Sequence, residues 1–359
     1  TDALRFTLLV GSTPGNDMNL SVKKVEANRN FANKLWNATR FVLSTITSEQ
    51  LAAAAAGDAA AGADAPGGER YSLADSWIWA RLQQVVRDVE RLFATFQYGE
   101  AGRQIYEFFW GDFADWYVEI AKLQMNQGGA RALDTAAYLV RILDTTLRLL
   151  HPFTPFITEE LWGHLRKAVL QSPLAGLAQD WPEALIVAAW PEPRPEEGWE
   201  AAKLADFTLV QSIVREVRNL RSEKNVKPGQ RIPALLVSSS AARVLREQSA
   251  TLAALAGLQA DRLQVLEQID GKPEGHIALV VGPVEIFLPL AGMVDAGEER
   301  ARLEKDLSET RAQVARLETL LGSSFAEKAP AAVVQKERDK LAGYQETAAK
   351  LQAQLDALN

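Results

Sequence analysis

The chain has 359 residues, 47% of them hydrophobic and 24% charged, which is the composition of an ordinary globular protein and the length of two or three domains. It contains no cysteine, which excludes disulfides and thiolate metal sites, and its three histidines are scattered along the sequence. The net charge of −7 gives no overall attraction for nucleic acid, and no apolar run approaches the ~20 residues that span a bilayer.

The first half of the chain has the pattern of a helical bundle. Residues 4–10 alternate between apolar and other side chains, which predicts a short strand already under way where the sequence starts. A helix is expected over 22–46, followed by a flexible Ala/Gly-rich loop over 51–70. Further amphipathic helices are expected over 73–97, 100–126, 130–150 and 155–171. The Pro-rich acidic stretch 190–198 ends this bundle.

The second half changes character twice. A helix over 199–222 is followed by alternating strand and helix patterns up to about residue 292, which predicts a small α/β domain. Apolar residues then recur at heptad spacing in two runs, which include Leu303 to Leu321 and Val334 to Leu358. A Gly/Ser/Pro stretch separates the two runs. They predict an antiparallel coiled-coil hairpin, whose arms of some 28 residues would be about 42 Å long.

The fold class is therefore mainly α: a helical bundle, a small α/β domain and a C-terminal antiparallel coiled-coil hairpin. The hairpin is close to charge-balanced, so its composition gives little indication of nucleic-acid binding. A hairpin of this kind already buries its own apolar seam, which argues against a role in dimerisation.

The first long helix has an unusual polar face. The stretch "NRNFANKLWNATRF" (28–41) contains four asparagines, although asparagine is a poor helix former. At about 100° per residue, one side of the helix carries an apolar stripe. The stripe consists of Phe31, Leu35, Ala38 and Val42. The opposite side carries Arg29, Asn33, Asn37, Arg40 and Ser44, bordered by Trp36, Asn30, Phe41 and Lys34.

Two interpretations of this face remain open from the residues alone. Between residues 21 and 47 there are five Lys or Arg and one acid, in a chain that is acidic overall. Arginine for phosphate, asparagine for base edges and rings for stacking unpaired bases are the residue types that suit RNA. A face that is simply solvated explains the same residues equally well.

Other polar clusters favour structural interpretations. Asp112, Asp115 and Glu119 lie beside aromatic residues and could form a general acid/base pair, but ion pairs with arginines of a neighbouring helix are favoured. His151 is favoured as part of a helix-to-helix corner, with Thr154 as the N-cap and Pro155 in the first turn of the next helix.

A second basic stretch, residues 214–231, has six Lys or Arg against two acids. It could touch phosphates, but the surface of a helix and its connecting loop is favoured. No Gly-rich phosphate loop, G-x-S-x-G or H-E-x-x-H motif is present.

Several stretches match a known family in order along the chain. They are "TDALRFTLLVGSTPGNDMNLS", "RNFANKLWNATRFVL", "FFWGDFADWYVEIAK", "LLHPFTPFITEELW", "RNLRSEKNVKPGQRIP" and "FAEKAPAAVVQKERDKL". Together they resemble the C-terminal region of bacterial valyl-tRNA synthetases, which are class I aminoacyl-tRNA synthetases. The resemblance spans essentially the whole chain. The absence of a cysteine zinc module favours the valyl family over the isoleucyl one.

The resemblance implies a division of the chain into four parts. Residues 1–21 would end the stem-contact region, 22–198 would form the anticodon-binding bundle, 199–293 a junction domain and 294–359 a tRNA-binding arm. The H-I-G-H and K-M-S-K-S motifs of the family are absent, so the chain would lack the catalytic and editing domains. It would be inactive alone and need no cofactor, whereas the parent enzyme would use ATP with Mg²⁺ and valine.

The resemblance also implies partners and contact residues. The partner would be tRNA(Val), and the protein would be a cytoplasmic monomer that binds no membrane. The helical bundle would contact the anticodon loop, and the hairpin would contact the outer corner of the tRNA. The expected contacts are Arg29, Asn33, Lys34, Asn37, Arg40 and Phe41 on the first long helix, and Arg311, Arg316 and Lys340 on the arm.

Two other classes of function remain as alternatives. One is a protein-interaction scaffold whose projecting arm docks another protein. The other is a complete enzyme that uses the acidic cluster around Asp112.

Overall fold

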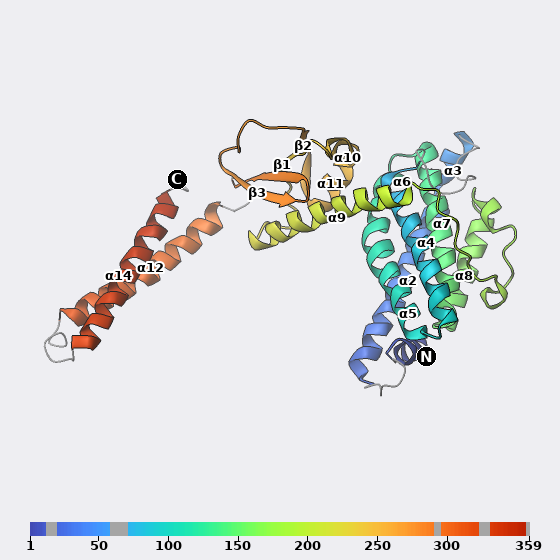
Figure 1. Cartoon of the computed structure of the whole chain (residues 1–359), viewed down its shortest axis with the longest axis horizontal. Coiled ribbons are helices and arrows are strands. Elements are labelled where there is room, and N and C mark those ends of the chain that lie inside the picture. The colour runs from blue at the N-terminus through green and yellow to red at the C-terminus, as the bar shows by residue number, and fades with distance from the viewer. Residues whose placement is uncertain (12–19, 58–70, 291–295, 323–330, 357–359) are drawn as a thin grey trace. The chain divides into compact units, whose positions relative to one another are not determined.

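The computed structural model describes residues 1–11, 20–57, 71–290, 296–322 and 331–356 (Figure 1). These residues are mainly helical with one small sheet, so the expected fold class is confirmed. They form two compact units, Thr1–Gln211 and Ser212–Asn359. Within the described ranges, no helix combines the length and apolar character needed to cross a membrane.

The first unit is a bundle of helices. In chain order they are α1 (Asp2–Val10), α2 (Val22–Ile46), α3 (Glu49–Gly57), α4 (Leu73–Ala94), α5 (Tyr98–Glu107), the π-helix η1 (Phe108–Tyr117), α6 (Val118–Met125), α7 (Gly129–Leu150), α8 (Pro155–Leu170) and the 3-10 turns η2 (Ala175–Ala178) and η3 (Leu185–Val187). The helix α9 (Glu200–Glu223) begins in this unit and ends in the second.

The strand expected over residues 4–10 is wrong, because this segment is the helix α1. Its buried residues are Asp2, Phe6 and Thr7, which do not alternate along the chain, whereas Leu4 and Leu8 are more than 40% exposed. The Phe6 ring stacks on Phe31 of α2 at 5.4 Å, which joins α1 to the bundle. Seven residues are too few to separate the strand period from the helical one when most of them are apolar.

The prediction of a loop over 51–70 is wrong for residues 51–57, which belong to α3. Alanine is the strongest helix former, and the buried Leu51 and Ala54 give this short helix a contact side. The remainder of the expected loop, 58–70, lies outside the described residues.

A buried polar network holds the start of α4. The Ser72 side chain accepts a hydrogen bond from the Asp75 backbone, and the Asp75 carboxylate accepts one from the Ser72 backbone, which is a capping box. Asp75 is fully buried, and it also accepts hydrogen bonds from Tyr117 Oη at 2.8 Å and Arg131 Nη1 at 3.3 Å. Burial raises the pKa of Asp75, and these donors oppose the rise.

The single helix expected over 100–126 contains a π-helical segment. The helix α5 is followed directly by the ten π-helical residues of η1, and the α-helix α6 follows η1 without a break. Phe109, Phe113 and Tyr117 of η1 are fully buried, so the widened turns pack large rings into the bundle core. π-helical turns are uncommon and often occur at functional sites.

The second unit contains a four-stranded sheet of order β2-β1-β4-β3. Its strands are β1 (Ile232–Val237), β2 (Leu258–Leu266), β3 (His276–Val281) and β4 (Val284–Pro289). The β1–β2 pair is parallel, connected through the helices α10 (Ala242–Glu247) and α11 (Ser249–Ala256), while β4 runs antiparallel to β1 and β3. The helical pattern between β1 and β2 thus forms two short helices.

The C-terminal helices are α12 (Ala296–Leu321) and α14 (Ala331–Asp356). They run antiparallel, because Arg311 contacts Gln352 and Glu318 contacts Gln345. Among the expected seam positions whose burial the structure describes, four are buried: Leu307, Leu317, Val334 and Leu355. Tyr344 is 39% exposed, so it does not complete the seam. Leu358 and the expected tip, 323–330, lie outside the described residues.

Candidate nucleic-acid interface

The helix α2 buries the apolar stripe that the sequence predicts. Phe31, Leu35 and Val42 are at most 1% exposed and Ala38 is 8% exposed. The helix begins where the Ser21 hydroxyl accepts a hydrogen bond from Lys24 N at 3.3 Å. This burial fixes the rotation of α2 about its axis, so the opposite face points outward.

The polar face of α2 is solvent-exposed, as its spacing predicts. Arg29, Asn33, Asn37 and Arg40 are exposed, and Phe41 and Lys34 are half-buried at the edge of this face. The structure thus brings all six expected residues of α2 to one side of the bundle. It divides them, however, into residues that line a groove and residues that do not.

A groove of about 420 Å³ lies between α2 and the η1–α6 segment. From α2 it is lined by Asn30, Asn33, Lys34, Asn37, Ala38 and Phe41, and from the other side by Trp110, Ala114, Val118 and Lys122. Four of the expected residues, Asn33, Lys34, Asn37 and Phe41, therefore share one concave surface. Arg29 and Arg40 lie outside its lining.

The π-helix places the second wall of this groove. Trp110, Ala114, Val118 and Lys122 follow one another at intervals of four residues. In an α-helix each interval of four rotates a side chain by about 40° around the axis, because a turn takes only 3.6 residues. The wider turns of η1 reduce this drift, so residues four apart stay closer to one line. The sequence analysis did not predict this wall. The repeated interval of four residues was the feature of the sequence that could have indicated it.

Two lysines are held at the rim of the groove. The Lys34 ammonium pairs with Asp115 and lies 4.6 Å from the centre of the Trp110 ring. The Lys122 ammonium pairs with Glu119 at 2.6 Å and lies 5.7 Å from the Phe41 ring. Each lysine thus contacts one carboxylate and one aromatic face, an arrangement that positions a cation without burying it.

The acidic cluster of η1 and α6 forms ion pairs, but only Asp112 pairs with an arginine of a neighbouring helix, as expected. Asp112 accepts a hydrogen bond from Arg81 Nε of α4 at 2.9 Å, and Asp115 and Glu119 pair with the two lysines of the groove. Nowhere in the described part of the chain do three metal-ligating side chains gather.

The corner between α7 and α8 contains His151, as expected. His151 Nδ1 lies 2.8 Å from Thr158 Oγ1, and burial lowers the pKa of the imidazole. Pro155 occupies the first turn of α8. Thr154 is at the N-cap position, but its hydroxyl donates back to Leu150 O at 3.3 Å instead of capping the helix.

The basic stretch 214–231 uses several arginines for structure. Arg221 donates to Gly257 O at 3.0 Å and to Gln230 O at 2.7 Å, while Arg218 donates to Leu255 O at 2.7 Å. Gly257 has φ of 69°, and a Cβ there would lie 3.0 Å from the Arg221 guanidinium. These contacts favour the interpretation of a helix surface and its connecting loop.

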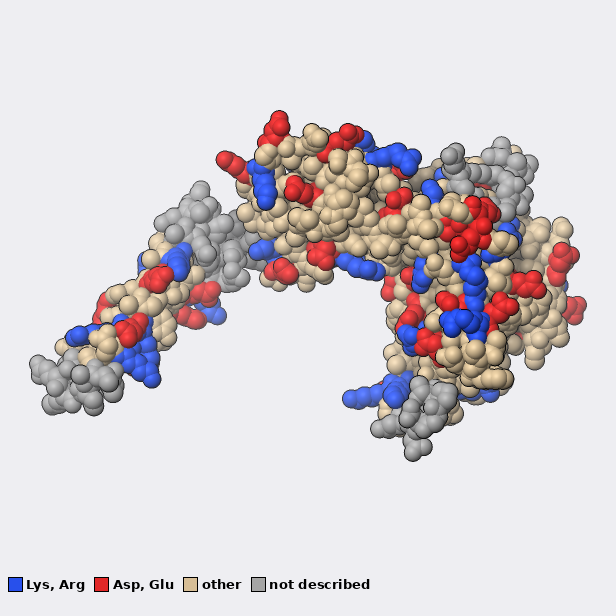
Figure 2. All heavy atoms as spheres, viewed as in Figure 1, with Lys and Arg blue, Asp and Glu red and all other residues tan. Residues whose placement is uncertain are grey.

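The expected residues of the hairpin are dispersed. Arg311 Nη2 donates to Gln352 Oε1 at 2.9 Å, and Lys340 pairs with Glu337 at 2.7 Å. Arg316 is exposed on α12. Figure 2 shows positive and negative side chains mixed along the hairpin, with Lys and Arg gathered next to its grey tip.

Comparisons with known proteins match both units. Residues 75–236 match the anticodon-binding domain of tRNA ligases, and residues 295–359 match the valyl tRNA synthetase tRNA binding arm. A valine–tRNA ligase of Dehalococcoides mccartyi is 38% identical over 354 residues, covering 98% of this chain and 38% of the relative.

Other relatives give the same result. The valine–tRNA ligase of Carboxydothermus hydrogenoformans is 38% identical, and the match covers 96% of this chain and 36% of the relative. The valine–tRNA ligase of Bacillus subtilis is 36% identical, and the match again covers 96% of this chain and 36% of the relative. The chain therefore spans less than two-fifths of the length of these curated relatives.

Proposed function

Because the chain belongs to the valyl-tRNA synthetase family, we propose that it is the tRNA-binding part of a valine–tRNA ligase. In this proposal the bundle binds the anticodon region of tRNA(Val), and the hairpin binds the outer corner of the same molecule. Both contacts support ATP-dependent attachment of valine to the tRNA. ATP, Mg²⁺ and valine bind other parts of the enzyme, so this region catalyses nothing alone. It acts as a monomer in the cytoplasm.

The groove between α2 and η1–α6 is the observation that carries the proposal. It combines the three kinds of group that hold an unpaired nucleotide. Phe41 and Trp110 line the groove with aromatic rings that a base would contact, and the Asn33 and Asn37 amides carry both donors and acceptors for a base edge. Lys34 and Lys122 place positive charge at the rim, where a phosphate would pass.

Arg29 and Arg40 have a different role in this proposal. They are exposed on α2 outside the lining of the groove, where they reach the phosphates on either side of a bound base. On the hairpin, Arg311, Arg316 and Lys340 would each contact a phosphate at a different place along the arm. Backbone contacts of this kind position an RNA without reading its sequence.

A paired substitution in α2 tests the proposal. The double variant Arg40→Ala/Phe41→Ala should weaken binding of a tRNA(Val) transcript in a filter assay by roughly ten-fold or more. Loss of one stacked base costs about 1–3 kcal/mol, and loss of one phosphate contact adds to it. The matched control is Arg91→Ala/Phe96→Ala at the end of α4, where both side chains are exposed and neither lines the groove.

Two results would count against the proposal. One is equal tRNA affinity in the α2 double variant and the control. The other is wild-type binding that does not change when the anticodon bases of the transcript are replaced, since a docking scaffold would not distinguish them.

A further inference from the structure

Each lysine of the groove on α2 reaches across it to an aromatic ring on the other wall. Lys34 comes from α2, and its ammonium lies 4.6 Å from the centre of the Trp110 ring of η1. Lys122 comes from α6, and its ammonium lies 5.7 Å from the centre of the Phe41 ring of α2. Both aromatic rings of the groove lining therefore have a cation over them.

The Trp110 ring also packs against the bundle. It stacks with the rings of Phe31 and Tyr106, whose centres lie 6.4 Å and 5.6 Å away, and Phe31 is 1% exposed. Trp110 and Lys34 both line the groove. The space over Trp110 that an entering base would need is therefore the space that the Lys34 ammonium holds.

An ion pair that joins the two walls holds the Lys34 ammonium in this place. Asp115 of η1 accepts a hydrogen bond from Lys34 Nζ of α2, although the two residues are 81 positions apart in the sequence. The Lys34 side chain is 26% exposed and that of Asp115 is 49% exposed, so water reaches the pair and the ammonium can exchange its partner. Lys122 differs, because its carboxylate partner Glu119 belongs to its own helix.

Asp115 is an unfavourable neighbour for RNA unless it does something other than bind. A carboxylate at the rim weakens the attraction of the groove for phosphate. An ion pair as exposed as this one also adds little to the stability of the fold. What the pair does accomplish is to keep the Lys34 ammonium over the Trp110 ring.

We propose that the Lys34–Asp115 pair is a latch that covers the Trp110 ring until RNA opens it, an inference that rests on the proposed binding of an unpaired nucleotide in the groove. The base takes the space over Trp110, the Lys34 ammonium moves to a phosphate of the same strand, and Asp115 is left in water. The lysine exchanges one charge-assisted contact for another, so opening costs little once a phosphate is near. The ligand that opens the latch must therefore bring both a base and a phosphate.

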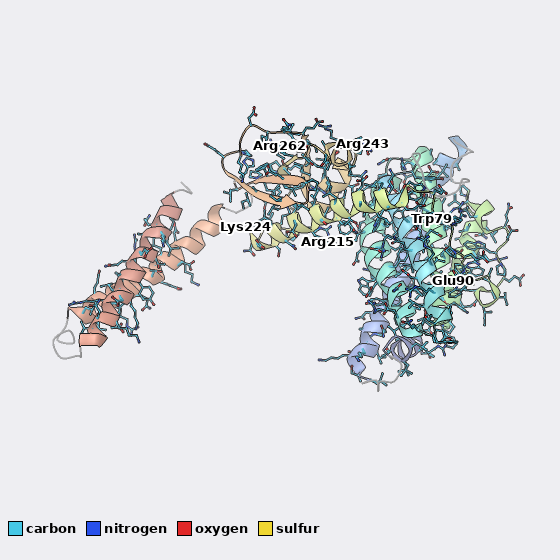
Figure 3. All side chains as sticks on the ribbon, viewed as in Figure 1. Trp79, Glu90, Arg215, Lys224, Arg243 and Arg262 are labelled. Atoms are coloured by element: carbon cyan, nitrogen blue, oxygen red, sulfur yellow. The ribbon has the colours of Figure 1, made fainter. Side chains whose placement is uncertain are left out.

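Filter binding of a tRNA(Val) transcript to the full chain tests the latch through Asp115→Asn, which removes the charge that holds Lys34 and keeps the size of the side chain. We expect this variant to bind roughly two- to five-fold more tightly than the wild type, because an exposed ion pair contributes a factor of this size. The matched control is Asp88→Asn on α4, two residues before Glu90 in Figure 3, where the aspartate pairs with Arg91 at 3.2 Å. This control should bind as the wild type does.

A second background separates the latch from simple repulsion between Asp115 and the RNA. In Lys34→Met there is no ammonium to hold, so Asp115→Asn should tighten binding less in this background than in the wild type. Equal gains in the two backgrounds would assign Asp115 to repulsion alone and overturn the proposal. Weaker binding of Asp115→Asn would overturn it too, because the ion pair would then hold the groove in its binding shape.

The proton resonances of the Lys34 side chain report the latch directly. The ring current of Trp110 shifts protons that lie over the ring upfield, and the signals missing from Lys34→Met identify those of Lys34. Adding the transcript should move these signals to the position of a solvated lysine. Signals that stay upfield when tRNA is present, or that show no upfield shift without it, would contradict the latch.

Failure of the latch and failure of the proposed function give different results. If Arg40→Ala/Phe41→Ala binds tRNA as well as its control does, the groove does not bind the anticodon region. If that double variant loses affinity while Asp115→Asn gains none, the groove binds tRNA and the latch alone is wrong.

Discussion

His151 shows how one side chain makes the stability of the bundle depend on pH. The Thr158 hydroxyl donates its proton to Thr154 O at 2.8 Å, so His151 Nδ1 donates to Thr158. Burial lowers the pKa of His151, while the nearby Glu159 and Asp2 partly oppose this change. The folded state therefore favours the neutral imidazole more than the unfolded state does.

The sign of the pH effect follows from this shift. Below about pH 6.5 the unfolded chain takes up a proton at His151 before the folded chain does, so stability decreases as the pH falls through that range. We expect the melting temperature of His151→Gln to fall less between pH 7 and pH 5 than that of the wild type. His164→Gln, on the exposed face of α8, is the control. Parallel wild-type and His151→Gln curves would contradict this prediction.

At the scale of elements, α1 and α5 approach each other closely at a glycine. A Cβ on Gly102 would lie 2.7 Å from Val10 Cγ2 of α1 and 2.9 Å from the Phe153 ring. Gly111, in η1, would meet no atom within 4 Å. These two helical glycines therefore differ in the space that a new side chain would find around it.

Alanine at these two positions should change stability in opposite directions. Gly102→Ala should lower the free energy of unfolding by about 1–3 kcal/mol, because the new methyl group overpacks the contact with α1. Gly111→Ala should raise it by about 0.5–1 kcal/mol, since alanine restricts the unfolded chain at no steric cost. Urea unfolding followed by circular dichroism measures both. Destabilisation of similar size in the two variants would show that the close approach of α1 is not the cause.

The elements also show what could be predicted from the sequence. The buried stripe of α2 was predictable because 25 residues contain several helical turns, enough to define its phase. The segment of α1 is shorter and mostly apolar, so its period was ambiguous. The groove could not be predicted, because its two walls come from residues some 80 positions apart in the sequence. In addition, the π-helical turns of η1 place the side chains of the second wall at positions that an α-helical period does not give. Trp110 and Lys122 were therefore missed although their partners on α2 were expected.

At the scale of the whole molecule, the proposed binding of tRNA has to overcome a net negative charge. The chain carries 46 acidic and 39 basic residues, so attraction for tRNA must come from local surfaces such as the rim of the groove. Phosphate contacts release counterions, and each one contributes to the dependence of affinity on salt. Binding should consequently weaken steeply between low and moderate ionic strength.

A lysine of the groove should contribute measurably to that dependence. Lys122→Met keeps the length of the side chain and removes its charge. We expect it to reduce the slope of log affinity against log salt by about 1. Lys167→Met, on the exposed side of α8, should leave the slope unchanged. An unchanged slope in Lys122→Met would mean that this lysine does not contact a phosphate.

The packing of α1 sets a limit on how far the bundle can be shortened. The Phe6 ring contacts Phe31, Tyr106 and Phe153, and Asp2 Oδ2 accepts a hydrogen bond from Ile157 N at 2.7 Å. A version of the chain that begins at α2 would leave those three rings uncovered on one side and one backbone donor without its acceptor. The smallest piece of the bundle that folds autonomously should therefore include α1, and shorter pieces should bind hydrophobic dyes and aggregate.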